Sequence, residues 1–310
     1  RLRDALAAAG WRVAVDAGPR QSLFEHILGA QRRPLPQAAD RRGLRPSDRL
    51  ARFGAGVLIQ LRETGQVFGF AGLTLVALAR AAANPRRLRW RSVAAQVDRI
   101  GVQAAGIVAL LTFLVGLVLA YQSVDQFERF GAEPLAVNVL GIIILREFGV
   151  LIAAILVAGR SGSAFCAEIG FMRANEEIDA MRAMGVDPIE ALVLPRLIGA
   201  LIALPLLTVL ADIAGVAGGV AYILLSVDMT VAQVIERLDF AVLPETFLLG
   251  LAKAPAFAAL IALVGCHKGA QVGGGADIVG RKTTESVVLS IFLVIVANAA
   301  FSVGYAIAGF

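Results

Sequence analysis

The stretch "IGVQAAGIVALLTFLVGLVLAY", residues 100–121, contains 22 consecutive residues without a charge. A helix needs about 20 mostly apolar residues to cross the hydrocarbon core of a bilayer, so this run is long enough to span one. The whole chain has the same character, with 58% hydrophobic and 17% charged residues and a mean hydropathy of +0.75. These values lie outside the range of soluble globular domains and predict an integral membrane protein.

Four further apolar runs have the length of a membrane span. They are 134–158 with Arg146 and Glu147, 197–225 with Asp212, 246–266 with Lys253, and the uncharged run 287–310. A shorter apolar run, 67–79, is flanked by basic residues and suits an interfacial helix better than a span. We therefore expect an all-α membrane domain over residues 53–310, with an elbow helix within 53–83 followed by five transmembrane helices.

The distribution of basic residues predicts the orientation, because lysine and arginine near span ends stay in the cytoplasm. Residues 1–99 hold 18 basic and 7 acidic groups, whereas residues 100–310 hold 11 and 17. The loops at 159–196 and 267–286 are also more basic than those at 122–133 and 226–245. We expect a cytoplasmic N-terminus and a periplasmic C-terminus. Anionic lipid headgroups explain the basic excess, so no nucleic-acid partner is expected.

Residues 1–52 differ in composition from the rest of the chain. "LRDALAAAG", "WRVAVD" and "RQSLFEHILGA" are typical of a helix, a strand and a helix, and residues 31–52 form a linker rich in arginine and proline. A unit of this size cannot bury a core alone. It is expected to be part of a cytoplasmic α/β domain, and the alternative is a solvated tail.

The segment "AEIGFMRANEEIDAMRAMGVDP", residues 167–188, is a polar insert between two apolar runs. Asn175 is a suitable N-cap, Glu176 and Glu177 favour the first turn of a helix, and Gly185 suits its end. The pattern predicts a cytoplasmic helix of about nine residues.

Three of the four methionines of the chain fall in this insert. Ile178 and Met181 recur at helical spacing with Met184 or Gly185, and a face rich in methionine can repack against a partner that moves. The alternative is a loop helix packed on its own bundle.

The charges within the spans are costly, on the order of 2.5–3.5 kcal/mol each at mid-bilayer, and are expected to face the protein interior. Arg146 and Glu147 are adjacent, so on a regular helix they should not point the same way. Lys253 could pair with Glu147 or with Asp212. A structural ion pair and a functional site both remain open at this point.

The sequence contains none of the common motifs of nucleotide-binding sites, metalloproteases or serine hydrolases. There is no G-x-x-x-x-G-K-[ST] phosphate loop, no H-E-x-x-H and no G-x-S-x-G. The glycine-rich stretch 269–284 is expected to be a flexible connection, with Thr283 or Thr284 capping the last span. We expect no enzymatic activity, no cofactor and no metal. If the protein moves a substrate against its concentration gradient, the energy would have to come from an ion gradient or from an ATPase on another chain.

Four motifs of the sequence are distinctive: "LREFG" (145–149), "AGRSGSAFCAEIGFMRANEEIDAMRAMGVDP" (158–188), "LAKAPAFAALIALVGCHKG" (251–269) and "DIVGRKTTESVV" (277–288). Together they closely resemble the MlaE/YrbE permeases of MCE-associated ABC transporters. The resemblance extends over residues 55–310 or so. Val150 departs from it, since relatives usually have proline there. Residues 1–52 resemble the C-terminal part of a STAS-like domain, which some relatives carry fused to the permease.

The resemblance implies a homodimeric permease of the bacterial inner membrane that moves phospholipid or a similar lipid. Two cytoplasmic ATPase subunits would power it, and a periplasmic MCE-domain protein would exchange the lipid. By position, the ATPase coupling residues would be Glu168, Met172, Arg173, Glu176, Glu177, Met181, Met184 and Asp187. The lipid cavity would involve Phe127, Phe130, Arg146 and Glu147.

Two other classes of function are alternatives. An ion-coupled secondary transporter would need inverted repeats with broken helices, and the sequence has no such corresponding pair of segments. A membrane scaffold would not need four charged residues inside its spans.

Overall fold

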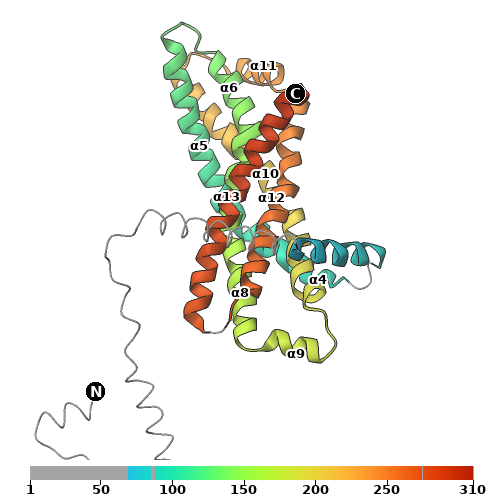
Figure 1. The fold of residues 1–310 in the computed structure, drawn as a ribbon. Helices are drawn as coiled ribbons and strands as arrows, with labels where there is room; N and C mark the ends of the chain where they lie inside the picture. Colours follow the sequence, from blue (N-terminus) through green and yellow to red (C-terminus); the bar gives the residue numbers. More distant parts are fainter. Residues whose placement is uncertain (1–68, 85–87, 274, 310) are drawn as a thin grey trace, which may run out of the picture. The chain divides into compact units, whose positions relative to one another are not determined.

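The computed structural model describes residues 69–84, 88–273 and 275–309, and the regular elements among them are all helical (Figure 1). The STAS-like prediction for residues 1–52 and the first part of the predicted elbow region, 53–68, lie outside the described residues. The remainder of the elbow region forms a helix, Gly69–Ala83. For the described part of the chain, the all-α prediction is confirmed.

Five helical stretches are long and apolar enough to cross a membrane, as predicted. The first, second and third stretches include π-helical turns, labelled η. In chain order the elements are α4 (Trp90–Val97), η3 (Asp98–Val102) and α5 (Gln103–Glu128); α6 (Leu135–Ile143), η4 (Ile144–Phe148), α7 (Gly149–Val157), η5 (Ala158–Gly162) and α8 (Ser163–Ala174); α9 (Glu177–Ala183); η6 (Ile189–Val193) and α10 (Leu194–Ser226); α11 (Val231–Ala241); α12 (Pro244–Ala270); and α13 (Ala276–Ala308).

The second stretch illustrates how far the helices extend beyond the apolar runs. Its apolar run ends at residue 158, but the helical backbone continues through Arg160 to Ala174. Hydropathy identifies only the part of a helix that lies in the hydrocarbon core, whereas the helical hydrogen bonding of the backbone can continue beyond the membrane. Residues 167–174 of the polar insert therefore belong to the end of the second stretch, and only α9 is a separate helix.

Two predicted helix caps are wrong. Asn175 ends α8 instead of starting α9, because a tight turn joins the two helices and Glu176 adopts a left-handed φ of 60° in it. Thr283 and Thr284 lie inside α13, which begins at Ala276, and their hydroxyls donate to backbone carbonyls one turn earlier at 2.8 and 3.2 Å. The predicted helix stop at Gly185 is confirmed by its φ of 75°.

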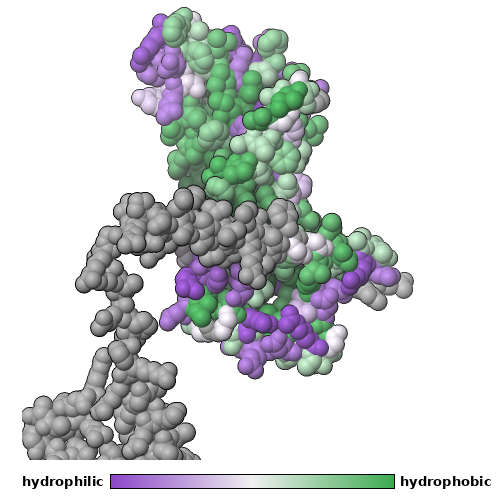
Figure 2. All heavy atoms as spheres, in the orientation of Figure 1, coloured by the Kyte–Doolittle hydropathy of each residue, from purple (hydrophilic) through white to green (hydrophobic). Residues whose placement is uncertain are grey.

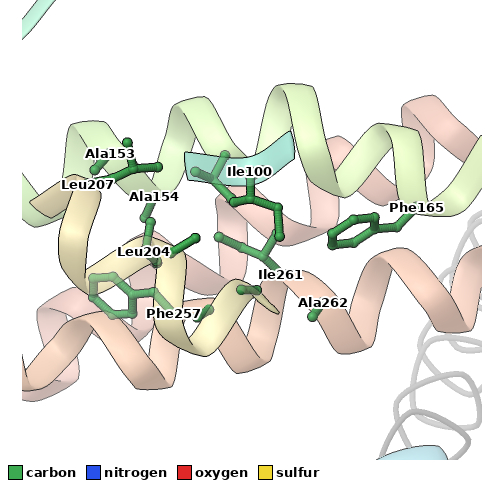
Figure 3. Close-up of a cluster of buried hydrophobic side chains, with 14 of the residues drawn as sticks. Ile100, Ala153, Ala154, Phe165, Leu204, Leu207, Phe257, Ile261 and Ala262 are labelled. Atoms are coloured by element: carbon green, nitrogen blue, oxygen red, sulfur yellow. The ribbon is translucent and has the colours of Figure 1, made fainter. Parts of the chain in front are cut away.

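Helix α10 forms the centre of the bundle and packs against α5, α7 and α12. Half of its most apolar window is buried, whereas only 11% of the corresponding window of α13 is buried. Figure 3 shows part of the core, where Leu204 and Leu207 of α10 lie among Ala153, Phe257 and Ile261. The third predicted span is thus the structural core, and the fifth lies at the periphery of the single chain.

Helices α5 and α10 approach closely because glycines face each other between them. A Cβ added at Gly116 would collide with the backbone oxygen of Gly215, and one added at Gly218 would collide with that of Phe113. Small residues at such positions let two membrane helices come into backbone contact.

Gly116→Ala should lower the free energy of unfolding by about 1–3 kcal/mol, the usual cost of overpacking. The measurement is thermal unfolding of the purified protein in detergent. Gly106→Ala is the matched control, since it lies on the same helix and its added Cβ would meet nothing within 4 Å. This control should be neutral or slightly stabilising, because alanine favours helix more than glycine does. Equal effects of the two substitutions would contradict the close approach.

The bundle has two distinct ends (Figure 1). Helices α8 and α9 lie at one end, and α11 lies at the other, beside the C-terminal end of α13. Figure 2 shows apolar side chains over the middle of the bundle and hydrophilic ones towards both ends. The helix Gly69–Ala83 packs at the α8 end of the bundle: Ala77 and Ala81 form a small buried cluster with Leu194, the first residue of α10.

Candidate functional site

Glu147 and Lys253 form an ion pair inside the apolar part of the bundle. Lys253 Nζ on α12 lies 2.9 Å from Glu147 Oε2 on η4, and the lysine side chain is completely buried. The structure thus selects Glu147, and not Asp212, as the partner of Lys253. Burying a lysine is costly unless it is paired and hydrogen-bonded, so its other contacts matter.

Two polar residues of α13 complete this network. Asn298 Nδ2 donates to Glu147 Oε2 at 3.0 Å, and the Ser302 hydroxyl donates to Glu147 Oε1 at 2.9 Å. Lys253 Nζ in turn donates to Asn298 Oδ1 at 3.3 Å and to the backbone carbonyl of Arg146 at 3.1 Å. We call Glu147, Lys253, Asn298 and Ser302 the polar network. It joins η4, α12 and α13 within the membrane-spanning part of the chain.

Asn298 and Ser302 were not singled out from the sequence. Both are uncharged, so neither interrupts the apolar run that predicts the fifth span. Their signal is spacing: side chains four residues apart lie on the same face of a helix, and Tyr305, whose ring lies 5.8 Å from Lys253 Nζ, follows on that face.

Arg146 and Glu147 both lie in the π-helical turn η4. Arg146 Nε lies 3.9 Å from Glu147 Oε1, so the ends of these two long side chains approach each other although the residues are adjacent in the sequence. The side chains are 25% and 26% exposed in the single chain. A glycine on α12 lets this helix approach η4 closely, because a Cβ at Gly250 would collide with the carbonyl oxygen of Leu145. π-Helical turns often occur at functional sites.

Asp212 lies apart from the polar network. It is 1% exposed on α10, and an added Cβ at Gly149 would collide with its Oδ1. Neither carboxylate oxygen has a hydrogen-bond partner among the described residues.

The two phenylalanines predicted to line a lipid cavity have different environments. Phe127 packs against a buried cluster that includes Val124 and Leu140, whereas Phe130 follows α5 and is 77% exposed. Of the four predicted cavity residues, the structure therefore brings only Arg146 and Glu147 into direct contact.

The predicted coupling segment contains a second ion-pair system, centred on Glu168. Its Oε1 lies 2.6 Å from Arg99 Nη1, and its Oε2 lies 2.8 Å from Arg196 Nη2. Arg196 is buried at the start of α10, and Arg99 belongs to η3. Glu168 therefore links the first, second and third spans at the α9 end and does not point outward as a docking residue would.

Glu168→Gln should lower the free energy of unfolding by about 2–3 kcal/mol, because it leaves the buried Arg196 without its anion. This is less than the cost for a fully buried pair, since Glu168 is 29% exposed. Chemical unfolding in detergent measures the change. Asp125→Asn is the control: it removes an exposed pair with Arg129 at 3.6 Å, which should contribute less than about 1 kcal/mol. If Glu168→Gln lowered the free energy of unfolding no more than this control does, Glu168 would not stabilise the contact between the spans.

The remaining residues of the coupling segment divide into inward and outward groups. Ile178 is buried and Met172 packs against the core, while Asp179 binds both Arg173 and Arg182 at 3.1 and 3.2 Å. Asp187 accepts a hydrogen bond from the Ile189 backbone and so caps the next helix. The outward surface, which we call the α9 surface, consists of Glu176, Glu177 and Met184, with Met181 partly exposed beside them. Met184 is 72% exposed.

In the described ranges, no three His, Cys, Asp or Glu side chains gather as a metal site would require. The geometry thus consists of an intramembrane polar network and an exposed helix at one end.

A comparison with protein families identifies the architecture. The model of the permease MlaE matches residues 93–303, which is more than half of the chain. The chain belongs to the MlaE permease family.

Named relatives agree with membership of the MlaE permease family. A probable ABC transporter permease protein of Rickettsia felis is 38% identical over 199 residues, which cover 64% of this chain and 77% of the relative. One of Synechocystis is 35% identical over 214 residues, covering 68% and 81%. The protein TRIGALACTOSYLDIACYLGLYCEROL 1 of Arabidopsis thaliana is 32% identical over 212 residues, covering 68% and 61%. The chain is therefore a membrane-spanning permease of the ABC transporter class, and permeases of this class are not themselves catalytic.

Proposed function

We propose that this chain is the permease subunit of a lipid transporter. In this proposal it moves phospholipid or a similar lipid between the bacterial inner membrane and a periplasmic MCE-domain protein, and a separate ATPase subunit supplies the energy. The observation that carries the proposal is the polar network, which places a buried lysine, a carboxylate and two polar groups inside an otherwise apolar bundle.

The partial exposure of Arg146 and Glu147 supports a homodimer. Both side chains lie within a membrane-spanning helix, yet each is about a quarter exposed in the single chain. A charge facing lipid tails would be costly, so the exposed part of these two side chains is expected to face protein or a water-filled cavity and not the lipid tails. A second copy of the chain would provide such a cavity at its interface. An amphiphile could then place its polar headgroup beside the polar network and its tails along the apolar walls.

The name of the plant relative favours lipid as cargo. It contains trigalactosyldiacylglycerol, which is a diacylglycerol lipid bearing three sugars. Neither a phosphate nor a sugar headgroup is singled out by the polar network, because its amide, hydroxyl and charged groups can bind either one.

The orientation and the domain division are also part of the proposal. The end with α8 and α9 carries more arginine than the end with α11, so we assign it to the cytoplasm and the C-terminus to the periplasm. Residues 53–310 would be the permease domain, and residues 1–52 a partial STAS-like segment. In this proposal the ATPase is a separate chain that docks on the α9 surface, in keeping with the absence of a phosphate-binding loop from residues 1–310.

A photo-crosslinking experiment tests this proposal. A benzophenone amino acid replaces Phe148, which is 37% exposed next to Glu147, or Phe292, which is 59% exposed on α13. After purification in lipid-free detergent, crosslinking at position 148 should capture retained phospholipid in the dimer. Position 292 controls for lipid bound to the outer surface. Capture at position 292 alone would exclude a lipid cavity beside the polar network.

A further inference from the structure

A small polar pocket lies between the first and second spans, away from the polar network. Its volume is about 110 Å³, and its lining includes Arg99, Gln103, Arg160 and Gln96, with Ile100 and Phe165 as apolar neighbours. Water occupies roughly 30 Å³ per molecule in the liquid, so the pocket can hold a group about as large as a few waters, such as a phosphate.

The charges around this pocket favour an anion. Arg160 donates to the backbone carbonyl of Arg99 and to Gln103 Oε1, both at 3.1 Å, and forms no ion pair with a described carboxylate. A guanidinium has five N–H donors, so others remain for a ligand. Glu168 is shared by Arg99 and Arg196, and Asp98 accepts a long 3.4 Å hydrogen bond from Gln103. Around the pocket, three positive charges, those of Arg99, Arg160 and Arg196, thus face two negative charges, those of Asp98 and Glu168.

Gln96 also lines the pocket. Its Oε1 atom is buried and has no hydrogen-bond partner among the described residues. A buried amide normally has its polar atoms paired. Because this atom is buried, it does not face the open volume of the pocket, and the guanidinium groups of Arg99 and Arg160 are the donors available to an anion there.

The pocket lies where a lipid headgroup would be. Arg99 immediately precedes the apolar run 100–121, and Arg160 follows the run 134–158 by two residues, so both arginines mark the same membrane boundary. From Gln103, exposed apolar residues continue along one face of α5 towards the opposite end. They are Ile107, Leu110, Leu114, Val118 and Tyr121, each 47–60% exposed. This stripe has helical spacing and offers a path for an acyl chain.

We propose that this pocket binds the phosphate of an anionic phospholipid from the cytoplasmic leaflet, with an acyl chain along the α5 stripe. The cytoplasmic assignment rests on the proposed orientation, but binding itself needs neither transport nor an ATPase. Basic pockets between membrane helices on the cytoplasmic side commonly accept anionic headgroups. The stripe distinguishes a lipid from a free phosphate ion, because only a lipid gains from apolar contact with α5.

Native mass spectrometry of the full chain, titrated in detergent with phosphatidylglycerol, tests the site. Arg160→Gln should weaken binding of one lipid per chain by about tenfold, as expected when charge-assisted hydrogen bonds are removed. Arg160→Lys should retain part of the affinity. Arg91→Gln is the matched control, because Arg91 is an exposed arginine of α4 that does not line the pocket. Equal weakening by Arg160→Gln and Arg91→Gln would overturn the site.

Two further measurements use the unaltered protein. Millimolar inorganic phosphate should not displace phosphatidylglycerol, and displacement at similar concentrations would mean a simple anion site. Phosphatidylglycerol with a diazirine near its headgroup should crosslink to peptides containing residues 96–107 and 160–165. Crosslinks found only elsewhere would contradict the proposal even if the Arg160 variants failed to fold.

Discussion

Lys253→Met should lower the free energy of unfolding by about 3 kcal/mol, the lower end of the range for breaking a buried ion pair by removing one partner. Methionine matches the length of the lysine stem but removes the cation closest to Glu147, so that only the more distant Arg146 remains, at 3.9 Å. The lower end applies because Glu147 is 26% exposed, whereas the Lys253 side chain is fully buried. Loss of the helical circular-dichroism signal during titration with SDS measures the change.

The double variant, Lys253→Met with Glu147→Gln, separates pairing from packing. Glutamine can still accept the hydrogen bond from Ser302, so the double variant should regain at least half of the lost stability. Both variants should lose lipid transfer in reconstituted vesicles if the charges act in transport. A Lys253→Met variant as stable as the unaltered protein would show that the pair has no structural role.

Glu177→Lys combined with Met184→Asp should abolish association with the ATPase subunit while leaving the permease folded. Both residues are exposed on the α9 surface, where the substitutions reverse one charge and replace an apolar contact by a carboxylate. Truncating a few central contacts can remove most of the binding energy of an interface. Co-purification of the ATPase with the tagged permease from membranes measures the effect.

The matched control makes the same two kinds of change, a charge reversal and an apolar residue replaced by aspartate, at the opposite end of the bundle. Glu236→Lys with Phe240→Asp alters α11, another exposed amphipathic helix, and Phe240 is 84% exposed. This control should retain the ATPase. If the α9 variant also retained it, coupling through the α9 surface would be excluded. If both variants lost it, the cause would be general misfolding, which size-exclusion chromatography would reveal.

The sequence predicts the five spans well because hydropathy is a local property. An uncharged run such as 100–121 can only be stable in a membrane or a core, and its length selects the membrane. The helix ends were predicted less well. Asn175 has the right chemistry for an N-cap, but the turn between α8 and α9 depends on how both helices pack, and Glu176 takes the strained position.

The polar network could be predicted only in part. Glu147 and Lys253 stand out as charges in apolar runs, yet they are 106 residues apart, and the sequence could not decide between Glu147 and Asp212 as the partner. That choice depends on the π-helical turn η4 and on the missing side chain at Gly250, both of which concern how two helices meet. Asn298 and Ser302 carry no charge and are conspicuous only once α13 is placed beside Glu147.

The glycine contacts between α5 and α10 restrict how the permease can move. Where backbone meets backbone, at Gly116 with Gly215 and at Gly218 with Phe113, no side-chain rotamer can change to absorb sliding. These two helices should therefore travel together as a rigid body through a transport cycle. A movement that opens the bundle would then have to involve α13, which is the least buried of the five spans. Each time α13 moved away, the hydrogen bonds of Asn298 and Ser302 to Glu147 would have to break.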